Sequence, residues 1–444
     1  MPLINARRYH ASINILASAL LFIAALSAAI LANSPLVNYY QDFLNMEVRL
    51  QFGDFNLLSH GGHTMTMLQF INDGLMTIFF LMVGLEIKRE VLVGELSSFR
   101  KASLPFIAAC GGMVLPVLIY TLICPPNTDG GHGLAIPMAT DIAFSLGVLS
   151  LLGPRVPLSL KIFLTAFAVV DDIGGILVIA IFYSSHIHVS YLLWTVLIYG
   201  ALYIIGKTRK HTNKLIFLLG GVTVWYLFMQ SGIHSTISGV LLAFVIPARP
   251  RLNVGKYIER IKRLINSFPT MCTDGSDGIV LTNQQIAKLK KVEASSDRVI
   301  STLQSMEDGL HNFVNFVILP LFAFANAGVI FSGGSGDLFG DVTYGVIFGL
   351  VVGKFVGIFG FTWIAIKTKV APMGSGMNWK NIAGVSLLGG IGFTVSLFIG
   401  NLSFAVTEPV LLNQAKLGVI LGSIVSGILG YWLLSAVLPK CKRA

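Results

Sequence analysis

Long apolar segments recur along the whole chain, and their length constrains its fold more than any other feature. A helix needs about 20 mostly apolar residues to cross the roughly 30 Å hydrocarbon core of a bilayer. Twelve segments approach or reach that length, and the sequence therefore predicts an all-α polytopic membrane protein with 12 transmembrane helices. The segments are residues 12–33, 68–87, 102–124, 133–152, 158–183, 189–206, 213–230, 232–248, 310–331, 342–366, 381–400 and 411–437.

Composition and charge placement support this class. Hydrophobic residues make up 54% of the 444 residues and charged residues only 12%, about half the charged share of soluble domains. With the N-terminus inside, 28 of the 31 Lys and Arg residues fall on inside segments, and the exceptions are Arg49, Lys354 and Lys416. This asymmetry follows the positive-inside rule and predicts that both termini are cytoplasmic. Because the net charge of +10 is spread over several loops, nucleic-acid binding is not expected.

Two segments fall outside the predicted spans. Residues 44–60 alternate in polarity and predict a hairpin around Gly53 on the outside. Residues 249–309 form the longest predicted cytoplasmic loop, and its "NQQIAKLKKVEASSDRVISTLQSME" has helical spacing. The basic residues there suit a solvated or lipid-headgroup-facing segment, or a site for a partner.

Asp171 and Asp172 are adjacent in "TAFAVVDDIGGILVIAIFY", with no basic residue nearby in the sequence. An ionised carboxylate costs roughly 2.5 kcal/mol or more near the centre of a membrane helix, and acids retained there are usually functional. Two neighbouring carboxylates in a low dielectric resist full ionisation. Such a pair binds protons or a cation, and each occupant excludes the other. The alternative is a pair that stays neutral and hydrogen-bonded in a polar pocket.

Residues 134–153, "LAIPMATDIAFSLGVLSLLG", predict an interrupted helix. Pro137 removes a helix hydrogen bond, and Thr140 and Asp141 follow directly. A break there would free backbone carbonyls, which are hard oxygen ligands for a small cation such as Na⁺. In a membrane span this combination favours an interruption over a continuous helix.

A second interruption is predicted in "SLLGGIGFTVSLFIG", where Gly389, Gly390 and Gly392 lie in mid-span. Glycines in spans serve close helix packing equally often. Position favours the interruption, because the third to fifth and the tenth to twelfth spans correspond in order and each triplet has its interrupted member in the middle. Three spans is an odd number, so the triplets cross in opposite directions, as in inverted-repeat transporters that bind their substrate at paired interruptions.

Lys354, in "GLVVGKFVGIFGFTW", lies too deep in its span to reach the surface easily. The buried acids available as partners are Asp141, Asp171 and Asp172. A structural ion pair and a role in transport are equally compatible with this position. An aspartate and a lysine would also balance the partial charges at the ends of two interrupted helices.

Three further polar residues have two interpretations each. Glu86 and Glu90 are four residues apart at the inner end of the second span, where they form a solvated helix end or an acidic funnel for cations. His234, in "SGIHSTISGV", is a hydrogen-bonded structural histidine or a group that titrates near neutral pH.

Together these motifs resemble the NhaA-type sodium/proton antiporters. The resemblance extends over nearly the whole chain from about residue 65. It is carried by "INDGLMTIFFLMVGLEIKRE", "MATDIAFSLGVLSLLG", "LKIFLTAFAVVDDIGGILVIAIFY", "SGIHSTISGVLLAF", "FVILPLFAFANAGV", "GKFVGI" and "GGIGFTVSLFI".

The resemblance implies a role for each matching residue. It implies that Asp172 binds the cation, and that Asp171 takes part in binding and proton exchange and forms a salt bridge with Lys354. Thr140 and Asp141 match the pair at the crossing of the interrupted helices, and Thr140 would complete a Na⁺ site with the two aspartates.

The resemblance also implies residues that respond to pH. Glu86 and Glu90 match acids of a cytoplasmic funnel, Glu307 matches an acid at the start of the ninth span, and His234 matches a histidine linked to pH response.

The family further implies a homodimer in membrane lipid, held partly by the hairpin at 44–60, in the bacterial inner membrane. No cofactor is expected beyond the transported Na⁺, Li⁺ and H⁺. The expected organisation is an interface part (1–101), a first core repeat (102–183), spans six to eight (184–248), the cytoplasmic loop (249–309), span nine (310–331) and a second core repeat (342–437).

We therefore expect an antiporter, not an enzyme, that expels Na⁺ and also Li⁺ in exchange for protons by alternating access. Two protons per Na⁺, as the family implies, would make transport electrogenic, and the same carboxylates would make it pH-dependent. One alternative is a cation-coupled solute symporter on a related fold, which would need a roomy polar pocket. Another is an intramembrane aspartyl protease, in which Asp141 and Asp172 would share a proton and Lys354 would be a liability.

Overall fold

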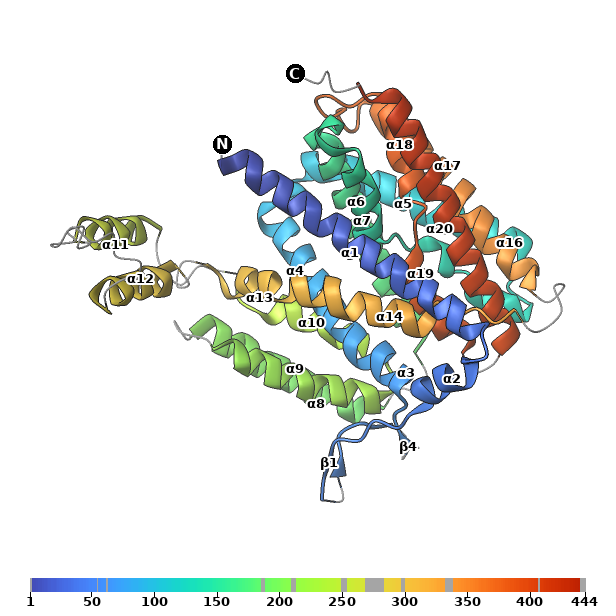
Figure 1. The fold of residues 1–444 in the computed structure, drawn as a ribbon, viewed down its shortest axis with the longest axis horizontal. Helices are drawn as coiled ribbons and strands as arrows, with labels where there is room; N and C mark the ends of the chain where they lie inside the picture. The colour runs from blue at the N-terminus through green and yellow to red at the C-terminus, as the bar shows by residue number, and fades with distance from the viewer. Residues whose placement is uncertain are drawn as a thin grey trace.

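The fold is a bundle of helices with a small hairpin region and one helical pair outside the bundle (Figure 1). The computed structural model describes residues 2–53, 55–60, 63–184, 188–208, 213–248, 254–267, 283–296, 300–331, 338–405 and 408–439. The first half contains α1 (Pro2–Ala32), α2 (Val37–Asn45), α3 (Met67–Gln69), α4 (Met76–Val93), α5 (Phe99–Ile123), α6 (Ile142–Leu151), α7 (Leu158–Phe182), α8 (Val189–Thr208), α9 (Lys214–Ser231) and α10 (Thr236–Val245).

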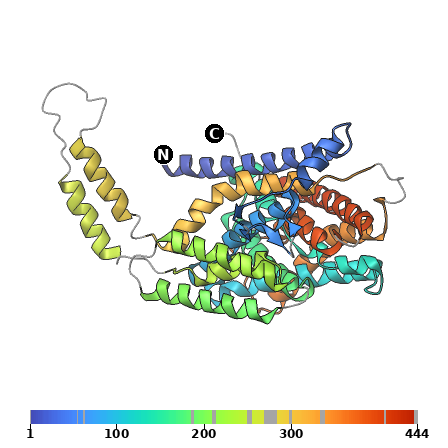
Figure 2. The same cartoon turned by 90° about the horizontal axis from the view of Figure 1, so that it is seen from below.

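The second half begins with the helical pair α11 (Val254–Asn266) and α12 (Asn283–Ser296). It continues with α13 (Thr302–Phe313), α14 (Leu319–Asn326), α16 (Asp341–Phe348), α17 (Lys354–Lys367), α18 (Trp379–Leu388), α19 (Phe393–Phe404) and α20 (Pro409–Val437). Short π-helical turns join several of these helices, namely η1 (Phe70–Leu75), η6 (Val314–Ile318) and η7 (Gly349–Gly353). The 3₁₀ turns are η2 (Glu95–Ser97), η3 (Asp129–Gly133), η4 (Ile136–Met138) and η5 (Gly153–Arg155). In Figure 2, α1 lies along one face of the bundle and α8 and α9 along the opposite face.

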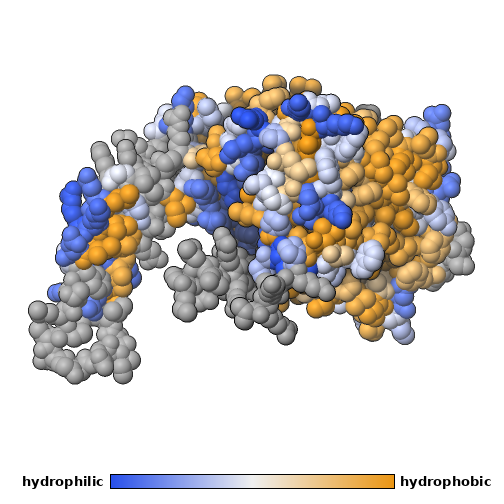
Figure 3. All heavy atoms as spheres, turned by 90° about the horizontal axis from the view of Figure 1, so that it is seen from above, coloured by the Kyte–Doolittle hydropathy of each residue, from blue (hydrophilic) through white to orange (hydrophobic). Residues whose placement is uncertain are grey.

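Membrane-crossing helices dominate, as the sequence predicts. Within the described ranges, nine helices are long and apolar enough to cross a membrane, or up to 11 if each of two bent helix pairs is one span. The predicted span at 232–248 contains α10, an apolar helix of only 10 residues. The predicted span at 310–331 belongs to a helix that runs from Thr302 to Asn326 and so begins earlier. Apolar side chains cover much of the outside of the bundle (Figure 3).

Both predicted interruptions coincide with bent helix pairs. The chain bends by 46° between the segment that ends at Met138 and α6, and by 42° between α18 and α19. Pro137 lies within η4, after which Ala139 and Asp141 take extended backbone conformations and α6 starts again at Ile142. The second break follows α18 directly, at residues 389–392.

The predicted hairpin around Gly53 is also present. Strand β1 (Gln51–Phe52) pairs antiparallel with β2 (Phe55–Asn56), and Gly53 has a φ of 63°, a value that glycine adopts without strain. A second two-residue pair, β3 (Ser59–His60) with β4 (His63–Thr64), follows directly. These short strands and one isolated bridge between Glu47 and Thr66 are the β-structure that the described residues contain, so the architecture is essentially all-α.

Helices α5 and α17 approach each other unusually closely, and two glycines make this possible. A Cβ atom added at Gly357 would lie 2.1 Å from the carbonyl oxygen of Gly111, and one added at Gly111 would lie 2.3 Å from the carbonyl oxygen of Gly357. Small residues at such crossings let helix backbones pack directly in membranes. Because Lys354 opens α17, this contact fixes the depth of its ammonium group.

We expect Gly357→Ala to destabilise the protein, because its new methyl group would push α17 away from backbone atoms of α5. Overpacking of this kind costs about 1–3 kcal/mol. The midpoint of thermal unfolding of the purified protein in detergent should fall. Gly360→Ala is the matched control on the same helix, since a Cβ at Gly360 meets nothing within 4 Å. Equal midpoints for the two variants would contradict this account of the packing.

Candidate functional site

Asp171, Lys354 and Thr140 meet at the centre of the bundle. Lys354 Nζ forms an ion pair with Asp171 Oδ2 and lies 2.9 Å from Thr140 Oγ1. The Thr140 hydroxyl lies 2.6 Å from Asp171 Oδ2 and 2.9 Å from the carbonyl oxygen of Gly389, so it can donate to either. Asp171 is 1% exposed and Lys354 is fully buried. An ion pair this deeply buried has lost its exposure to solvent, so each charge depends on direct contact with the other.

Asp141 anchors the two interrupted helices to each other. Its Oδ1 accepts the backbone N–H of Phe144 at 3.0 Å, which makes Asp141 the N-cap of α6. Its Oδ2 accepts the backbone N–H and the hydroxyl of Thr394, at 3.1 and 2.7 Å, in the first turn of α19. One carboxylate thus caps two helix N-termini, where backbone dipoles favour negative charge.

Further contacts between the breaks satisfy backbone groups that a helix would otherwise pair. Asp141 N–H donates to the carbonyl of Ile391 at 2.7 Å. Ser145 Oγ donates to the carbonyl of Leu388, and Ser396 Oγ to that of Ile136. Each break therefore supplies the hydrogen-bond partners that the other lacks in an apolar environment.

The predicted glycines lie within this crossing. Gly389 provides the carbonyl that Thr140 contacts. A Cβ at Gly390 would lie 2.3 Å from the carbonyl oxygen of Leu350, and one at Gly392 would lie 2.3 Å from Ser396 Oγ. Their role in the geometry is to admit backbone and side-chain atoms from neighbouring segments.

Asp172 points into a different environment from that of Asp171. It lines a cavity of about 220 Å³ together with Thr140, Asp141 and Thr394. In the described part of the chain, Asp172 forms no ion pair, and its Oδ1 accepts no hydrogen bond. Oδ1 of Asp171 likewise accepts none. The carboxylate of Asp172 and the hydroxyl of Thr140 therefore line the cavity, and the carboxylate of Asp171 lies directly beside that hydroxyl. Oxygen atoms of these kinds are ligands that suit a small hard cation.

Acidic residues around one arginine lie further along the same cavity. Arg89 lies 2.8 Å from Glu307, 3.1 Å from Glu90 and 3.8 Å from Glu86. Glu86, Arg89 and Glu307 line the cavity wall. Glu90 instead accepts the backbone N–H of Glu95 at 3.0 Å. The structure thus brings the three predicted acids together, with Glu86 and Glu307 facing the cavity.

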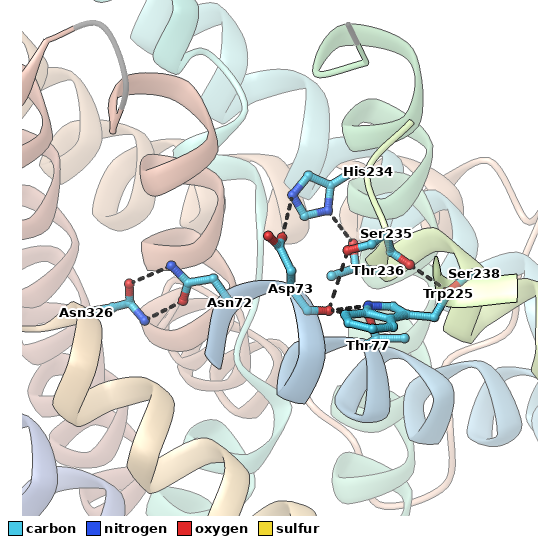
Figure 4. A network of polar contacts seen from close by, with 9 residues as sticks. All are labelled: Asn72, Asp73, Thr77, Trp225, His234, Ser235, Thr236, Ser238 and Asn326. Carbon is cyan, nitrogen blue, oxygen red and sulfur yellow. Dashed lines mark hydrogen bonds and ion pairs between the residues drawn. The ribbon is translucent and has the colours of Figure 1, made fainter. Parts of the chain in front are cut away.

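His234 lies elsewhere, at the start of α10, within the polar network that Figure 4 draws. Its Nε2 lies 3.4 Å from Asp73 Oδ1, its Nδ1 lies 2.9 Å from Thr236 Oγ1, and its ring meets the Phe398 ring edge-on. Asp73 belongs to the π turn η1 that precedes α4. The histidine therefore lies beside the start of α4, whereas Glu86 lies in the second half of that helix.

Several residues of these sites carried no sequence prediction. Thr394 holds Asp141, and three asparagines form a chain in which Asn326 bonds to both Asn72 and Asn401. Figure 4 shows the Asn72–Asn326 part of this chain. The sequence signal that could have identified the asparagines is an amide side chain inside an apolar segment, because a buried amide must find a hydrogen-bond partner.

The catalytic dyad of the alternative interpretation, an aspartyl protease, is not formed by this arrangement. Both carboxylate oxygens of Asp141 accept hydrogen bonds from helix N-termini, and no hydrogen bond joins Asp141 to Asp172 in the described residues. Two acids that share a proton would have to be in direct contact.

The comparisons with known proteins all match this chain to Na⁺/H⁺ antiporters. A family model described as Na⁺/H⁺ antiporter 1 matches residues 9–434. The chain is 69% identical to a Na(+)/H(+) antiporter NhaA of Bacteroides fragilis over 440 residues, which cover 99% of this chain and all of that protein. It is 68% identical to the protein of the same name from Bacteroides thetaiotaomicron over the full length of both. Against the one from Porphyromonas gingivalis the identity is 47%, over 93% of this chain and 92% of the relative.

We expect Lys354→Met and Asp171→Asn to destabilise the protein singly, because each leaves the other partner buried without compensation. Breaking a buried pair costs about 3–5 kcal/mol. The double variant should lose less than the sum of the two, and the thermal unfolding midpoints of the purified proteins measure the difference. Lys367→Met is the control, since that lysine is at the exposed end of α17. Additive losses of stability would show that the interaction between Lys354 and Asp171 does not itself stabilise the protein.

Proposed function

We propose, from the premise that the chain belongs to the Na⁺/H⁺ antiporter 1 family, that it expels Na⁺ and Li⁺ in exchange for protons at the paired aspartates. The protein is a transporter and not an enzyme. Na⁺/H⁺ antiport is the activity that its relatives' names carry, at 68–69% identity over their full length.

The uncompensated state of Asp172 is the observation that supports this assignment. Three carboxylates are buried at the crossing. Asp171 has the Lys354 ammonium, and Asp141 has two helix N-termini. Among the described residues, Asp172 has neither kind of partner, although it is only 6% exposed. A buried carboxylate without a protein partner is neutralised by a proton or by a cation, and this is the competition that antiport requires.

The exchange follows from that competition. Na⁺ enters the cavity past Glu86 and Glu307 and takes the place of a proton on Asp172, with the free oxygen of Asp171 and the Thr140 hydroxyl as further ligands. Binding there weakens the hold of Lys354 on Asp171, because both cations attract the same carboxylate. One bundle then moves against the other and exposes the site to the opposite side, where protons displace Na⁺.

Two protons per Na⁺ would make each cycle move one net charge. A membrane potential then contributes about 2.3 kcal/mol per charge per 100 mV. The protons would be carried by Asp172 and by the Asp171–Lys354 pair. This stoichiometry is part of the proposal and rests on the family.

We also propose how the helices are arranged in the membrane. The nine long helices, the two bent pairs and the short α10 would make 12 spans, with both termini in the cytoplasm and the protein in the inner membrane. Residues 102–183 and 342–437 would be inverted core repeats. Residues 1–101, with the hairpin β1–β2, would form the interface part and help to hold a homodimer.

We expect Asp172→Asn to abolish Na⁺- and Li⁺-driven dissipation of a pH gradient in everted membrane vesicles. An asparagine keeps the shape of the side chain but cannot exchange a proton for a cation. The response should fall to that of vesicles without the protein. Asp341→Asn is the matched control, because Asp341 is exposed at the start of α16, and it should retain activity. A fully active Asp172→Asn would move the exchange to other residues.

The apparent affinity for Na⁺ should fall as the pH falls, because protons and Na⁺ compete for the same carboxylates. The apparent KM for Na⁺ should rise about tenfold per pH unit if one proton competes, and more steeply if two do. Transport rates at varied Na⁺ between about pH 6.5 and 9 measure this slope. Glu307→Gln should change the transport rate at low Na⁺ without changing the slope of the apparent KM against pH. A KM independent of pH would require a separate proton site.

A further inference from the structure

The pair α11–α12 is the part of the described chain that the antiport site does not explain. The two helices pack against each other and extend away from the bundle in both Figure 1 and Figure 2. They form an excursion between α10 and α13, within the predicted loop at 249–309.

The helix α11 has a continuous apolar stripe. Its apolar residues are Val254, Tyr257, Ile258, Ile261, Leu264 and Ile265, which recur at three- and four-residue steps and so lie on one face. Packing against α12 covers this face only in part. Ile258 is 48% exposed, Ile265 60% and Leu289 of α12 45%. Two short helices are too small to bury their own apolar surface, and three large aliphatic side chains remain in solvent.

Basic residues are frequent at the remaining positions of the two helices. The two helices carry seven Lys and Arg residues against Glu259 and Glu293. They are Lys256, Arg260, Lys262, Arg263, Lys288, Lys290 and Lys291. In Figure 3 the pair shows a hydrophobic patch with hydrophilic residues along its edge. An apolar face combined with a polar face rich in Lys and Arg is the pattern of helices that lie in the interface of an anionic membrane.

The attachment of the pair keeps it near the bilayer. The backbone N–H of Leu303 donates to the carbonyl of Pro247 at 3.3 Å, so the two ends of the excursion are joined where they leave the bundle. α10 ends at Val245 and is fixed there by Lys88, whose ammonium contacts the carbonyls of Ala243 and Phe244. The returning chain enters α13, which begins a candidate membrane span at Thr302. Both connections therefore start at the end of membrane helices.

We propose that α11 and α12 lie on the surface of the membrane that the bundle crosses, bound to anionic lipids. Ile258, Ile265 and Leu289 enter the boundary between headgroups and acyl chains, and the flanking lysines and arginines contact lipid phosphates. The negative surface potential of an anionic membrane acts within about one Debye length. The short attachment to the bundle is therefore what brings the two helices close enough to contact the lipid. The proposal concerns a lipid-binding surface and is independent of which residues exchange Na⁺ and protons.

Hydrogen–deuterium exchange of the full-length protein in lipid nanodiscs tests this proposal. Nanodiscs of phosphatidylcholine are compared with nanodiscs that contain roughly one part phosphatidylglycerol to three of phosphatidylcholine, at low and at high salt. Amides of residues 254–267 and 283–296 should exchange about tenfold more slowly over the anionic lipid at low salt, since several charges each gain from the surface potential. High salt should remove most of the difference, and α2 (Val37–Asn45) should be unaffected.

Variants separate charge from burial. Lys288→Gln combined with Lys290→Gln and Lys291→Gln should abolish the dependence on anionic lipid, whereas Glu259→Gln, which raises the basic excess, should increase it. Ile258→Ser with Ile265→Ser should lose the protection in both lipids, and unchanged exchange of these variants in detergent would show that the pair still folds.

Three outcomes would overturn the proposal. Equal exchange in both lipids with strong protection would mean that protein covers the pair. Protection that depends on protein concentration would assign the surface to a second copy of the chain. Rapid exchange in both lipids would mean a pair that is simply solvated.

Discussion

The crossing of two interrupted helices is the constraint on which the rest of the structure depends. A break in a membrane helix releases backbone groups that lipid cannot satisfy. Here Asp141 and Ser396 bond across the crossing to α19 and to the residues before α6, so neither break is satisfied without the other. The two halves of the chain must therefore assemble before either interrupted segment is stable. The site is formed by their contact and belongs to neither half alone.

The same crossing distributes charge unevenly, and this unevenness gives the site its chemistry. The partial positive charges of two helix N-termini are matched by Asp141, and the Lys354 ammonium is matched by Asp171. The residue left over is Asp172, which faces the cavity. Because the other charges are balanced by fixed groups, the exchange of a proton for a cation that we propose at Asp172 would alter the charge balance of the whole crossing. That is how one ion can shift the equilibrium between two arrangements of a bundle.

Much of this could be predicted from the sequence, because hydropathy and helix breakers act locally. Apolar length, Pro137 and the mid-span glycines predicted an all-α membrane bundle and the places of the two bent helix pairs, whereas the described residues contain nine candidate spans, or up to 11 with the bent pairs, and not the predicted 12. The start of α13 was not predicted, because "TLQSMED" is polar and a hydropathy pattern ends the span where a polar segment begins. Those residues stay in the helix because Glu307 contacts Arg89 and faces the cavity. The asparagine chain was also missed, because Asn72 and Asn326 are 254 positions apart and only the fold brings them together.

His234 shows that a sequence pattern does not give the depth at which a residue lies in the bundle. Helices α4 and α10 run in the same direction, since Gly239 packs against Thr77, and Gly84 packs against Ala243. Polar contacts join them at both ends, His234 with Asp73 at one end and Lys88 with the last carbonyls of α10 at the other. Asp73 and Glu86 are thirteen residues apart, or about 20 Å of helix. Protonation of His234 would strengthen its attraction to Asp73, and any effect on the cavity would have to pass through the packing of α4 on α10.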